Sequence, residues 1–580
     1  MEIIEVSIDT LFPNGIIFSD LFVGLVSAVS AYSVKINYYN ANSPSALHFS
    51  GGRYGKGEVA EFVIIEGQFH FLLGRVVEVK LPESDRTELK VTNPHPTTLD
   101  VIGVIQLLAT IKIDNLNVTA GVETYPRLGD RVYAAPHRFV SFIPELMNKV
   151  TDFDSKMSIS LGLVNSNMAN TIKFLPEKLF GRHCAILGST GGGKSWTTAK
   201  IIEECIKYNS KLILLDATAE YRSLISPYIE HYYLGEIPDN DKQKYNDVKM
   251  VSLPPKCFLE SDFIAMFEPS GKVQGPKLKA AIKSLKLLHL KPGIQNQIFD
   301  FGILKKIGVK KELLNSYYSA NRIDLNDPNL EFDVTKLADQ IREECVSFFN
   351  NQSGISDDNS YSYCLSLISR IESILSSPSF NCVFKTNQKE PLNRVIDKFL
   401  QEKDKRLLRI CLSGLPYEYN AREIIANVIG RLLLREARKG AFIDKPIIVF
   451  LDEAHNFLGK HIGGDDFATK LDSFEIIAKE GRKYGLNICL ATQRPRDITE
   501  GVLSQIGTLI VHRLTNDKDR DVVERASGEI DRYASSFLPN LKQGEAVIIG
   551  SDFPIPLTIK IHEPKYKPIS DGPDFQKAWK

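Results

Sequence analysis

A glycine-rich loop is the strongest chemical signal in the sequence. It reads Gly188-Ser189-Thr190-Gly191-Gly192-Gly193-Lys194-Ser195, which matches the pattern G-x-x-x-x-G-K-[ST] of a phosphate-binding loop (P-loop). An apolar run precedes it, and a helix-forming segment that begins at Trp196 follows it. In such a loop, backbone N–H groups and the lysine bind phosphate oxygens, and the serine hydroxyl binds Mg²⁺. The sequence therefore predicts that Gly188–Trp196 bind ATP, with Mg²⁺ at Ser195.

Two adjacent carboxylates follow an apolar run later in the chain. Residues 447–451 are Ile-Ile-Val-Phe-Leu, and Asp452 and Glu453 come directly after them. We expect Asp452 to hold Mg²⁺ through its water shell and Glu453 to polarise the attacking water. The second carboxylate favours a hydrolase, because many kinases need a hydroxyl acceptor instead of an activated water. His455 lacks the partner of an H-E-x-x-H zinc motif, so it is expected to be a polar contact in the wall of the site.

Two further groups could act on the phosphates. Gln493 follows another apolar run, and its neutral amide can both donate and accept, which suits it to sense the γ-phosphate or to position the water. Arg482 lies in the segment Ala478–Gly485. Its spacing fits two interpretations equally well. Arg482 is either a solvated charge at a helix end or an arginine finger that stabilises charge on the phosphoryl oxygens.

The surrounding sequence predicts the elements that position these groups. From about residue 155 strand and helix patterns alternate, and the strand candidates are almost continuously apolar, as in a parallel sheet that is buried on both faces. Residues 236–404 lose strand character and show helical spacing, which predicts a mainly helical insertion into that sheet. Besides the P-loop strand, the strand candidates are residues 211–215, 407–413, 446–451, 487–492 and 508–512.

The first part of the chain has a different pattern. Short runs of β-forming residues recur to about residue 137, separated by glycine, proline, asparagine and serine, which predicts a small barrel or sandwich. Nothing in this region suggests catalysis, so we expect a binding or assembly module. The strand candidates are residues 21–26, 60–65, 73–79, 107–113 and 130–135.

Composition limits the class of protein. A chain of 580 residues, 43% hydrophobic and 24% charged, is long enough for several domains and has an ordinary globular composition. No apolar stretch is long enough to span a membrane, and the eight cysteines form no C-x-x-C pair, which indicates reduced thiols in a cytoplasmic protein. The formal net charge is zero. No overall basic field therefore points to nucleic acid, although basic side chains could still be concentrated locally.

Taken together, the motifs resemble the HerA branch of the FtsK–HerA superfamily of hexameric DNA-pumping ATPases. The P-loop, Asp452–His455 and residues 491–495 carry the resemblance, together with the segments Arg182–Leu187, Asp216–Tyr221, Glu480–Gly485 and Leu538–Ala546. It implies an α/β fold with a RecA-like P-loop ATPase core, a mainly parallel sheet, an N-terminal β-barrel similar to the HAS barrel and an inserted helical domain. The implied boundaries are 1–140 for the barrel, 141–235 and 405–560 for the core, 236–404 for the insertion and 561–580 for a C-terminal tail.

The resemblance also assigns roles that spacing leaves open. It makes Arg482 the preferred finger for a neighbouring subunit's nucleotide, with Arg182 as a second arginine near the nucleotide. The role of Glu220 stays open between the outer shell of Mg²⁺ and packing between strands. The family implies a homo-hexamer with nucleotide between subunits and double-stranded DNA in a central channel. The loop Gly459–Asp466 is a candidate DNA contact, although a surface loop without that role is the more ordinary interpretation.

Two classes of function follow. The first is a DNA-translocating motor, a helicase-type ATPase that works with a partner nuclease. The second is a ring-shaped ATPase scaffold in bacterial anti-phage defence, which would assemble and regulate an effector such as a sirtuin-type NAD hydrolase or a nuclease. The chain has no nuclease carboxylate cluster or dinucleotide-binding fingerprint, so both classes need a partner protein, for which the barrel is the expected docking surface. The Asp-Glu pair and the lack of an N-K-x-D motif argue against a P-loop kinase or GTPase.

Overall fold

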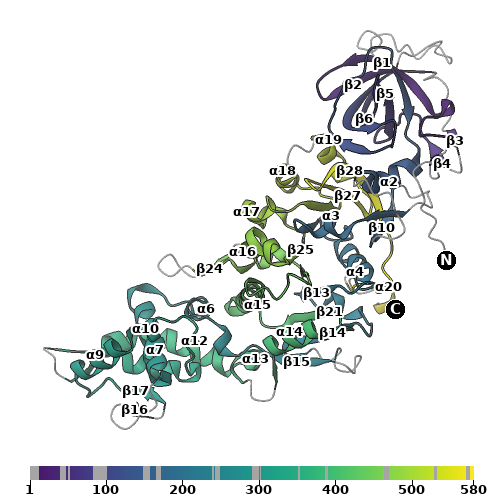
Figure 1. The fold of residues 1–580 in the computed structure, drawn as a ribbon. Helices are drawn as coiled ribbons and strands as arrows, with labels where there is room; N and C mark the ends of the chain where they lie inside the picture. Colours follow the sequence, from purple (N-terminus) through teal and green to yellow (C-terminus); the bar gives the residue numbers. More distant parts are fainter. Residues whose placement is uncertain are drawn as a thin grey trace. The chain divides into compact units, whose positions relative to one another are not determined.

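The computed structural model consists of two compact units (Figure 1). Unit 1 comprises Met1–Tyr208, Gln493–Arg496 and Ile506–Lys565, and unit 2 comprises Asn209–Thr492, Asp497–Gln505 and Tyr566–Lys580. The chain crosses between the units several times, so segments distant in sequence share a unit. The structure describes all residues except 1–11, 13, 40–46, 50–51, 82–100, 148–156, 165–170, 238–240, 242–247, 291–298, 301, 350–352, 386–388, 459, 463–468, 528–531, 570–574 and 580.

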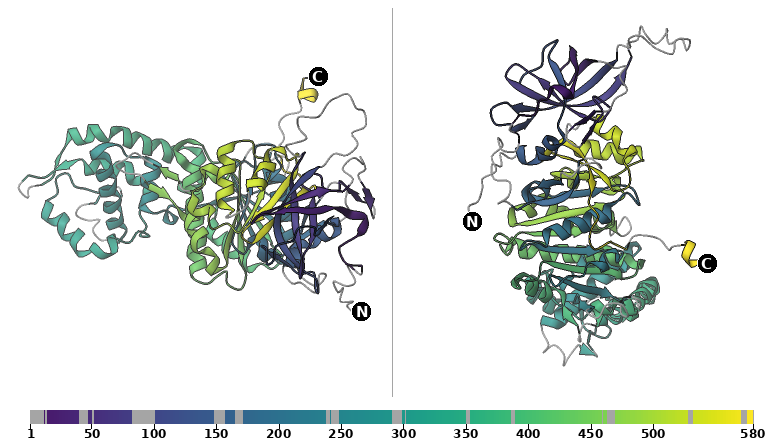
Figure 2. Two further views of the ribbon diagram at one scale, coloured as in Figure 1. Left: turned by 90° about the horizontal axis from the view of Figure 1, so that it is seen from above. Right: turned by 90° about the vertical axis from the view of Figure 1, so that its right-hand side faces the viewer.

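The N-terminal part of unit 1 is a closed β-barrel (Figures 1 and 2). Its strand order is β2-β1-β9-β5-β6-β7, and pairing of β2 with β7 closes the ring, while β8 extends β7. Buried side chains alternate with exposed ones along β2, and those that point inward form one apolar core. The predicted barrel is therefore confirmed. The strands are β1 (Phe22–Val29), β2 (Ser33–Tyr38), β5 (Phe62–Glu66), β6 (His70–Lys80), β7 (Ile102–Lys112), β8 (Val118–Ala120) and β9 (Arg131–Ala134), and β3 (Leu47–Phe49) pairs separately with β4 (Gly52–Tyr54).

The rest of unit 1 carries the P-loop. Its strands have the order β11-β10-β28-β27-β26-β12, in which β12 and β26 are parallel and the other pairs are antiparallel. The strands are β10 (Ile159–Leu163), β11 (Thr171–Phe174), β12 (Cys184–Leu187), β26 (Thr508–Val511), β27 (Glu545–Gly550) and β28 (Phe553–Ile561). The helices are α2 (His137–Met147), α3 (Pro176–Phe180), α4 (Lys194–Cys205), α18 (Asp517–Ala526) and α19 (Arg532–Phe537).

Unit 2 is built on a parallel sheet of order β25-β22-β13-β21-β14-β15-β20. All six residues of β13 are buried, as are the first six of β21, so the predicted apolar strands form the centre of a two-sided sheet. The strands are β13 (Lys211–Asp216), β14 (Ile229–Gly235), β15 (Lys249–Ser252), β20 (Glu390–Pro391), β21 (Leu407–Gly414), β22 (Ile447–Leu451) and β25 (Leu486–Thr492). The other elements of this region are α15 (Ala421–Arg438), β23 (Lys460–Ile462), β24 (Thr469–Leu471), α16 (Ser473–Glu480), α17 (Glu500–Leu503) and, near the C-terminus, α20 (Phe575–Ala578).

Most of the segment between β14 and β21 is helical, as predicted (Figure 2, teal). The expectation that it lacks strand character is wrong in one respect, because β15 and β20 extend the parallel sheet. The helices are α6 (Glu260–Phe267), α7 (Gly271–Leu290), α9 (Lys311–Ala320), α10 (Arg322–Leu325), α11 (Leu337–Glu344), α12 (Asp358–Ser376), α13 (Asn381–Phe384) and α14 (Leu392–Gln401), and the other short strands are β16 (Phe299–Asp300), β17 (Ile303–Leu304), β18 (Val346–Ser347) and β19 (Ile355–Ser356).

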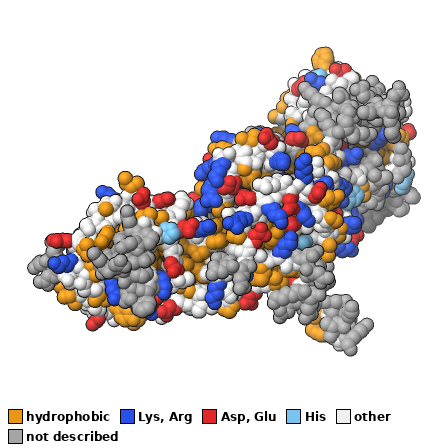
Figure 3. Space-filling model, turned by 60° about the horizontal axis from the view of Figure 1, so that its bottom comes forward, with side chains coloured by type: hydrophobic (Ala, Val, Ile, Leu, Met, Phe, Trp, Pro, Cys, Tyr) orange, Lys and Arg blue, Asp and Glu red, His pale blue; other side chains and the backbone are white. Residues whose placement is uncertain are grey.

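The surface shows no bias to one charge on the face in Figure 3, where basic and acidic side chains are interspersed. This agrees with the zero formal net charge of the whole chain. Within the described residues, no helix is long and apolar enough to cross a membrane.

Candidate nucleotide-hydrolysis site

The P-loop of unit 1 connects the end of β12 to the start of α4. Gly191 and Gly193 have φ angles of 74° and 116°, in the left-handed region that glycine occupies without strain. Gly193 is also the N-cap of α4 and supplies no capping side chain, so the first N–H groups of the helix are not capped by it. A helix start of this kind attracts phosphate through its dipole and N–H groups. The predicted loop thus has the backbone that phosphate binding requires.

Hydrogen bonds hold the loop and bring Gln493 to it. Ser189 donates to the carbonyl oxygen of Arg513 through both its backbone N–H and its hydroxyl, each at 2.9 Å. The Lys194 ammonium donates to the Ser189 carbonyl at 3.2 Å, within the loop. The Thr190 hydroxyl donates to the side-chain oxygen of Gln493. Gln493 and the P-loop therefore lie side by side within unit 1.

A buried histidine supports the loop from behind. The Nε2 atom of His512 is 2.8 Å from the Thr197 hydroxyl in α4, and its Nδ1 is 2.8 Å from the Glu545 carbonyl oxygen. Since a carbonyl only accepts, Nδ1 carries the proton and Nε2 accepts from Thr197. Burial, aided by the charge of Lys194, lowers the pKa of His512 to about 4, so the ring is neutral. A Cβ atom on Gly188 would lie 2.6 Å from the Cβ atom of His512, so this close packing requires glycine.

The carboxylates lie in unit 2, directly after β22. The Thr218 hydroxyl and the Tyr221 hydroxyl donate to the two oxygens of Asp452 at 3.4 and 3.5 Å. Glu453 has a φ angle of 49°, a left-handed conformation that is uncommon for a residue with a side chain. Its carboxylate lies 3.3 Å from Nδ1 of His455, which is also 3.2 Å from the Thr492 hydroxyl. His455 is thus a polar contact beside the carboxylates, as predicted.

A buried ion pair fixes the neighbouring strand ends. The guanidinium of Arg409 in β21 contacts Asp216 at the end of β13 at 2.7 Å, and both side chains are fully buried. Asp216 also accepts from the backbone N–H groups of Thr218, Glu220 and Tyr221 at 3.2–3.3 Å. Burial lowers the pKa of Arg409, but Asp216, Cys411 and Tyr233 together raise it by more, which keeps the guanidinium charged. Asp216 therefore folds the loop that supplies both hydroxyl contacts to Asp452.

The two arginines with expected roles occupy different settings. Arg482 is exposed on the short helix Gly481–Tyr484, and its side chain forms no hydrogen bond or ion pair with any described residue. Arg182 donates to the Ser551 hydroxyl at 3.1 Å and lies 3.8 Å from Asp552. It precedes β12, whereas the P-loop follows that strand. The two ends of the strand lie at opposite edges of the sheet, so Arg182 is not beside the P-loop of its own subunit.

The donor set fits a nucleotide with Mg²⁺. Within the described residues, no three His, Cys, Asp or Glu side chains come together as a metal site. Ser195 of unit 1 offers a hydroxyl and Asp452 of unit 2 offers a carboxylate, which are oxygen donors of the kind that Mg²⁺ prefers. Trp196 is half-buried at the start of α4, directly after Ser195. Gly459 and residues 463–466 of the candidate DNA loop lie outside the described residues, and 460–462 form β23.

Comparison with known families covers both halves of this site. Residues 159–432 match the family model "Helicase HerA, central domain", and residues 435–548 match "Helicase HerA-like C-terminal". Together the two models span about two thirds of the chain, including the P-loop, Asp452, Glu453 and Gln493. The chain belongs to the HerA-like family. The predicted resemblance is confirmed, and with it the α/β P-loop ATPase fold and the assignment of the chain as an ATPase.

Relatives of this HerA-like ATPase include two proteins of Methanocaldococcus jannaschii. A probable helicase is 24% identical over 73% of this chain and 74% of its own length. A probable DNA double-strand break repair helicase HerA is 25% identical over 82% of this chain and 90% of its own length. Among solved structures, VirB4 of Thermoanaerobacter pseudethanolicus is similar with a TM-score of 0.43 and 13% identity, over 71% of this chain and 98% of that chain.

Two residues that support the site of this HerA-like ATPase were not predicted. Arg409 interrupts an otherwise apolar strand. A charge at a central strand position needs a buried counter-ion, so the sequence of this strand could have predicted a buried ion pair. His512 follows an apolar strand, which is a common position for a histidine. No sequence pattern indicates that its ring contacts Thr197, just after the P-loop and more than 300 residues earlier in the sequence.

Proposed function

We propose that this HerA-like ATPase forms a homo-hexamer that hydrolyses ATP with Mg²⁺ and moves double-stranded DNA, in concert with a partner nuclease or effector protein. The main support is Arg482, an exposed arginine without a partner among the described residues, on the helix that directly follows α16. An arginine that completes the nucleotide site of a neighbouring subunit must be exposed and must not be held by a partner in its own subunit. The DNA part is supported by the relatives, of which one is named a probable DNA double-strand break repair helicase.

In the proposed reaction each group has one task. Backbone N–H groups of Gly188–Ser195 and the Lys194 ammonium bind the phosphates, and Gln493 orients the water from its position beside Thr190. Bound Mg²⁺ would neutralise charge on the phosphate oxygens, held by Ser195 and by Asp452 through water. Glu453 accepts a proton from the attacking water. Arg482 of one subunit stabilises the charge that develops on the phosphates of its neighbour.

Arg182 fits the same subunit arrangement. Because it lies at the strand end opposite to its own P-loop, a role near nucleotide requires the nucleotide of a neighbouring subunit. Its loose contact with Asp552, at 3.8 Å and with nearly half of the arginine side chain exposed, leaves it able to move.

Duplex DNA provides the direct test. We expect it to stimulate ATP hydrolysis, and we expect DNA binding to weaken steeply as salt rises, because the release of counterions from the phosphates then gains less free energy. The measurement is the steady-state ATPase rate with and without duplex DNA at several salt concentrations, with Lys194→Ala as the inactive control. An ATPase rate that is the same with and without duplex DNA, even at low salt, would contradict the proposal of a DNA-translocating motor.

A regulatory scaffold for a defence effector is the second candidate. The zero net charge favours it, as do the interspersed charges on the face that Figure 3 shows, because that face has no broad basic surface for DNA. An ATPase rate that changes only when the effector protein is added would select the scaffold over the motor.

A further inference from the structure

Arg75 in the barrel is a buried cation without a carboxylate partner. Only 5% of the residue is exposed. Its Nε donates to the Ala60 carbonyl oxygen and its Nη2 to the Thr558 hydroxyl, both at 3.2 Å. No acidic side chain forms an ion pair with it among the residues that the structure describes. Its two protein acceptors are therefore neutral oxygens at the long end of the hydrogen-bond range.

Two aromatic rings hold the guanidinium in place. Its central carbon is 4.6 Å from the ring centre of Phe537 and 5.6 Å from that of Phe62. Such contacts compensate part of the lost hydration of a cation. Burial lowers the pKa of Arg75 to about 10, which still leaves the group charged at neutral pH. The protein thus keeps a fixed, ionised guanidinium whose Nη1 makes no hydrogen bond within the described structure.

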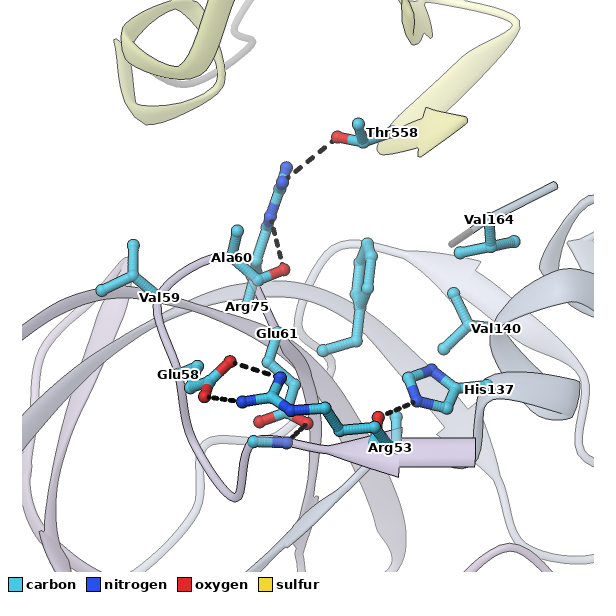
Figure 4. A pocket seen from close by; sticks show the side chains of 13 residues that line it. Arg53, Glu58, Val59, Ala60, Glu61, Arg75, His137, Val140, Val164 and Thr558 are labelled. Carbon is cyan, nitrogen blue, oxygen red and sulfur yellow. Dashed lines mark hydrogen bonds and ion pairs between the residues drawn. The ribbon is translucent and has the colours of Figure 1, made fainter. Parts of the chain in front are cut away.

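Arg75 lines a cavity of about 240 Å³, which Figure 4 shows from close by. Val140, Val164 and Phe62 form apolar parts of the wall, and His137 contributes an imidazole whose pKa is lowered by burial. None of the P-loop residues lines the cavity. The volume admits a molecule of several non-hydrogen atoms, since a water molecule takes roughly 30 Å³ of the liquid.

The two acidic residues in the wall have other partners. Glu58 forms an ion pair with Arg53 at 2.6 Å, and Glu61 accepts from the backbone N–H groups of Gly55 and Gly57 at 3.1 and 2.5 Å. In Figure 4 the Glu61 carboxylate lies beside Arg53, whereas the guanidinium of Arg75 points toward Thr558. Of the two arginines in the described wall, Arg53 is paired with Glu58, whereas Arg75 contacts no carboxylate.

We propose that this cavity binds a small oxyanion, a carboxylate or a phosphate, through the guanidinium edge of Arg75. The planar fork of arginine matches such groups, and the two rings and two hydrogen bonds hold it in one orientation before the ligand arrives. Arg75 and Phe62 belong to the barrel, whereas Thr558 and Phe537 belong to β28 and α19. The bound anion would therefore strengthen the contact between the barrel and these later elements of unit 1.

Calorimetric titration of the full chain with inorganic phosphate and, separately, with malonate tests the site. Saturating ADP with Mg²⁺ fills the P-loop beforehand, so that phosphate cannot bind there, and sodium chloride at equal ionic strength controls for salt. We expect saturable binding of at least one of the two anions. Arg75→Gln should weaken it at least tenfold, and Arg75→Lys less, because lysine keeps the charge but loses the fork. Arg127→Gln, at an exposed barrel arginine, should leave binding unchanged.

Two results would overturn the proposal. One is the absence of saturable binding of both anions to the wild-type chain. The other is unchanged binding in a folded Arg75→Lys variant, checked by circular dichroism, which keeps the test decisive if Arg75→Gln does not fold. A tenfold loss that appears equally in Arg127→Gln would also count against a specific site. Binding of malonate but not phosphate would identify the ligand class as a carboxylate, and the reverse would identify a phosphate.

Discussion

At the scale of single residues, the carboxylate that we propose as the base is held in an unusual backbone conformation. Glu453 has a left-handed φ angle of 49° directly after β22. For a residue with a side chain this costs about 1–3 kcal/mol and persists only where neighbouring contacts impose it. The contacts of His455 with Glu453 and Thr492 are of that kind. A strained residue at this position agrees with its proposed role as the base.

Replacing Glu453 with glutamine should separate binding from turnover. The amide keeps the size of the side chain but cannot accept a proton from water, so we expect hydrolysis to fall by on the order of 10²-fold or more. Nucleotide affinity should stay near the wild-type value, because Asp452 remains at the metal. Lys194→Ala is the matched comparison and should weaken binding itself. The measurement is nucleotide affinity and single-turnover rate for each variant, and normal turnover in Glu453→Gln would exclude this residue as the base.

His512 should make stability depend on pH. Its pKa is lowered to about 4 in the folded chain, against about 6.5 when unfolded, so between these values the unfolded chain binds the extra proton. Stability from the neutral ring is therefore complete above pH 6.5 and is lost as the pH falls towards 4. His512→Gln keeps an acceptor for Thr197 without this titration. Thermal unfolding midpoints from pH 7.5 to 4.5 should fall less steeply for the variant, and parallel curves would contradict the role of His512.

The sequence predicted the residues that have a local signature. Gly188–Ser195, Asp452 and Glu453 stand in short patterns that follow strands β12 and β22, so neighbours in sequence were enough to propose them as site residues. The supports of the site lack such patterns. Asp216, for example, binds three backbone N–H groups of its own loop and a guanidinium from another strand, and only the fold brings these together.

At the scale of elements, the apolar runs predicted β12, β13, β21, β22, β25 and β26, because a strand that is buried on both faces has no polar alternation to obscure it. The strands that were not predicted include β15 and β20. They are short, and Lys249 and Glu390 are exposed parts of them, so they carry little of the expected apolar pattern. They become strands because the outer edge of β14 offers backbone hydrogen bonds to β15, and β15 in turn pairs with β20.

The ion pair between β13 and β21 should be a major part of this sheet's stability. Arg409→Met leaves the Asp216 carboxylate buried without its cation, which we expect to cost about 3–5 kcal/mol. Arg409→Met combined with Asp216→Asn should recover part of the loss, since the unpaired charge is removed. Arg435→Ala, at an exposed ion pair with Glu436, should change stability by less than about 1 kcal/mol. Denaturant unfolding midpoints test this, and equal effects of Arg409→Met and Arg435→Ala would refute it.

At the scale of the whole molecule, ATP hydrolysis in the proposed ring depends on Arg482. Arg482→Ala should assemble and bind nucleotide almost normally but lose turnover by on the order of 10³-fold or more, because each site lacks its neighbour's guanidinium. Lys483→Ala, at the adjacent exposed lysine, is the matched control and should stay active.

Mixed rings sharpen this test. In a ring that contains both Arg482→Ala and Glu453→Gln subunits, the Arg482→Ala subunit keeps Glu453 and the Glu453→Gln subunit keeps Arg482. Some interfaces between subunits therefore contain both intact residues. Partial ATPase activity should therefore return when the two inactive proteins are mixed. If the subunits are shown to mix and no activity returns, Arg482 does not act in the site of a neighbour. Full activity of Arg482→Ala alone would exclude that role as well.

The support behind the P-loop has a consequence for how the protein is made. Cys184 of β12 pairs with Thr508, and the P-loop residue Gly192 accepts a hydrogen bond from the N–H of Gly544. On the ribosome, the phosphate loop emerges long before these partners are translated. The nascent chain must then carry an unfinished nucleotide site while most of the protein is still being synthesised. Only when β26 and β27 have emerged can unit 1 close, so we expect newly made chains to acquire their affinity for nucleotide only after translation has passed β27.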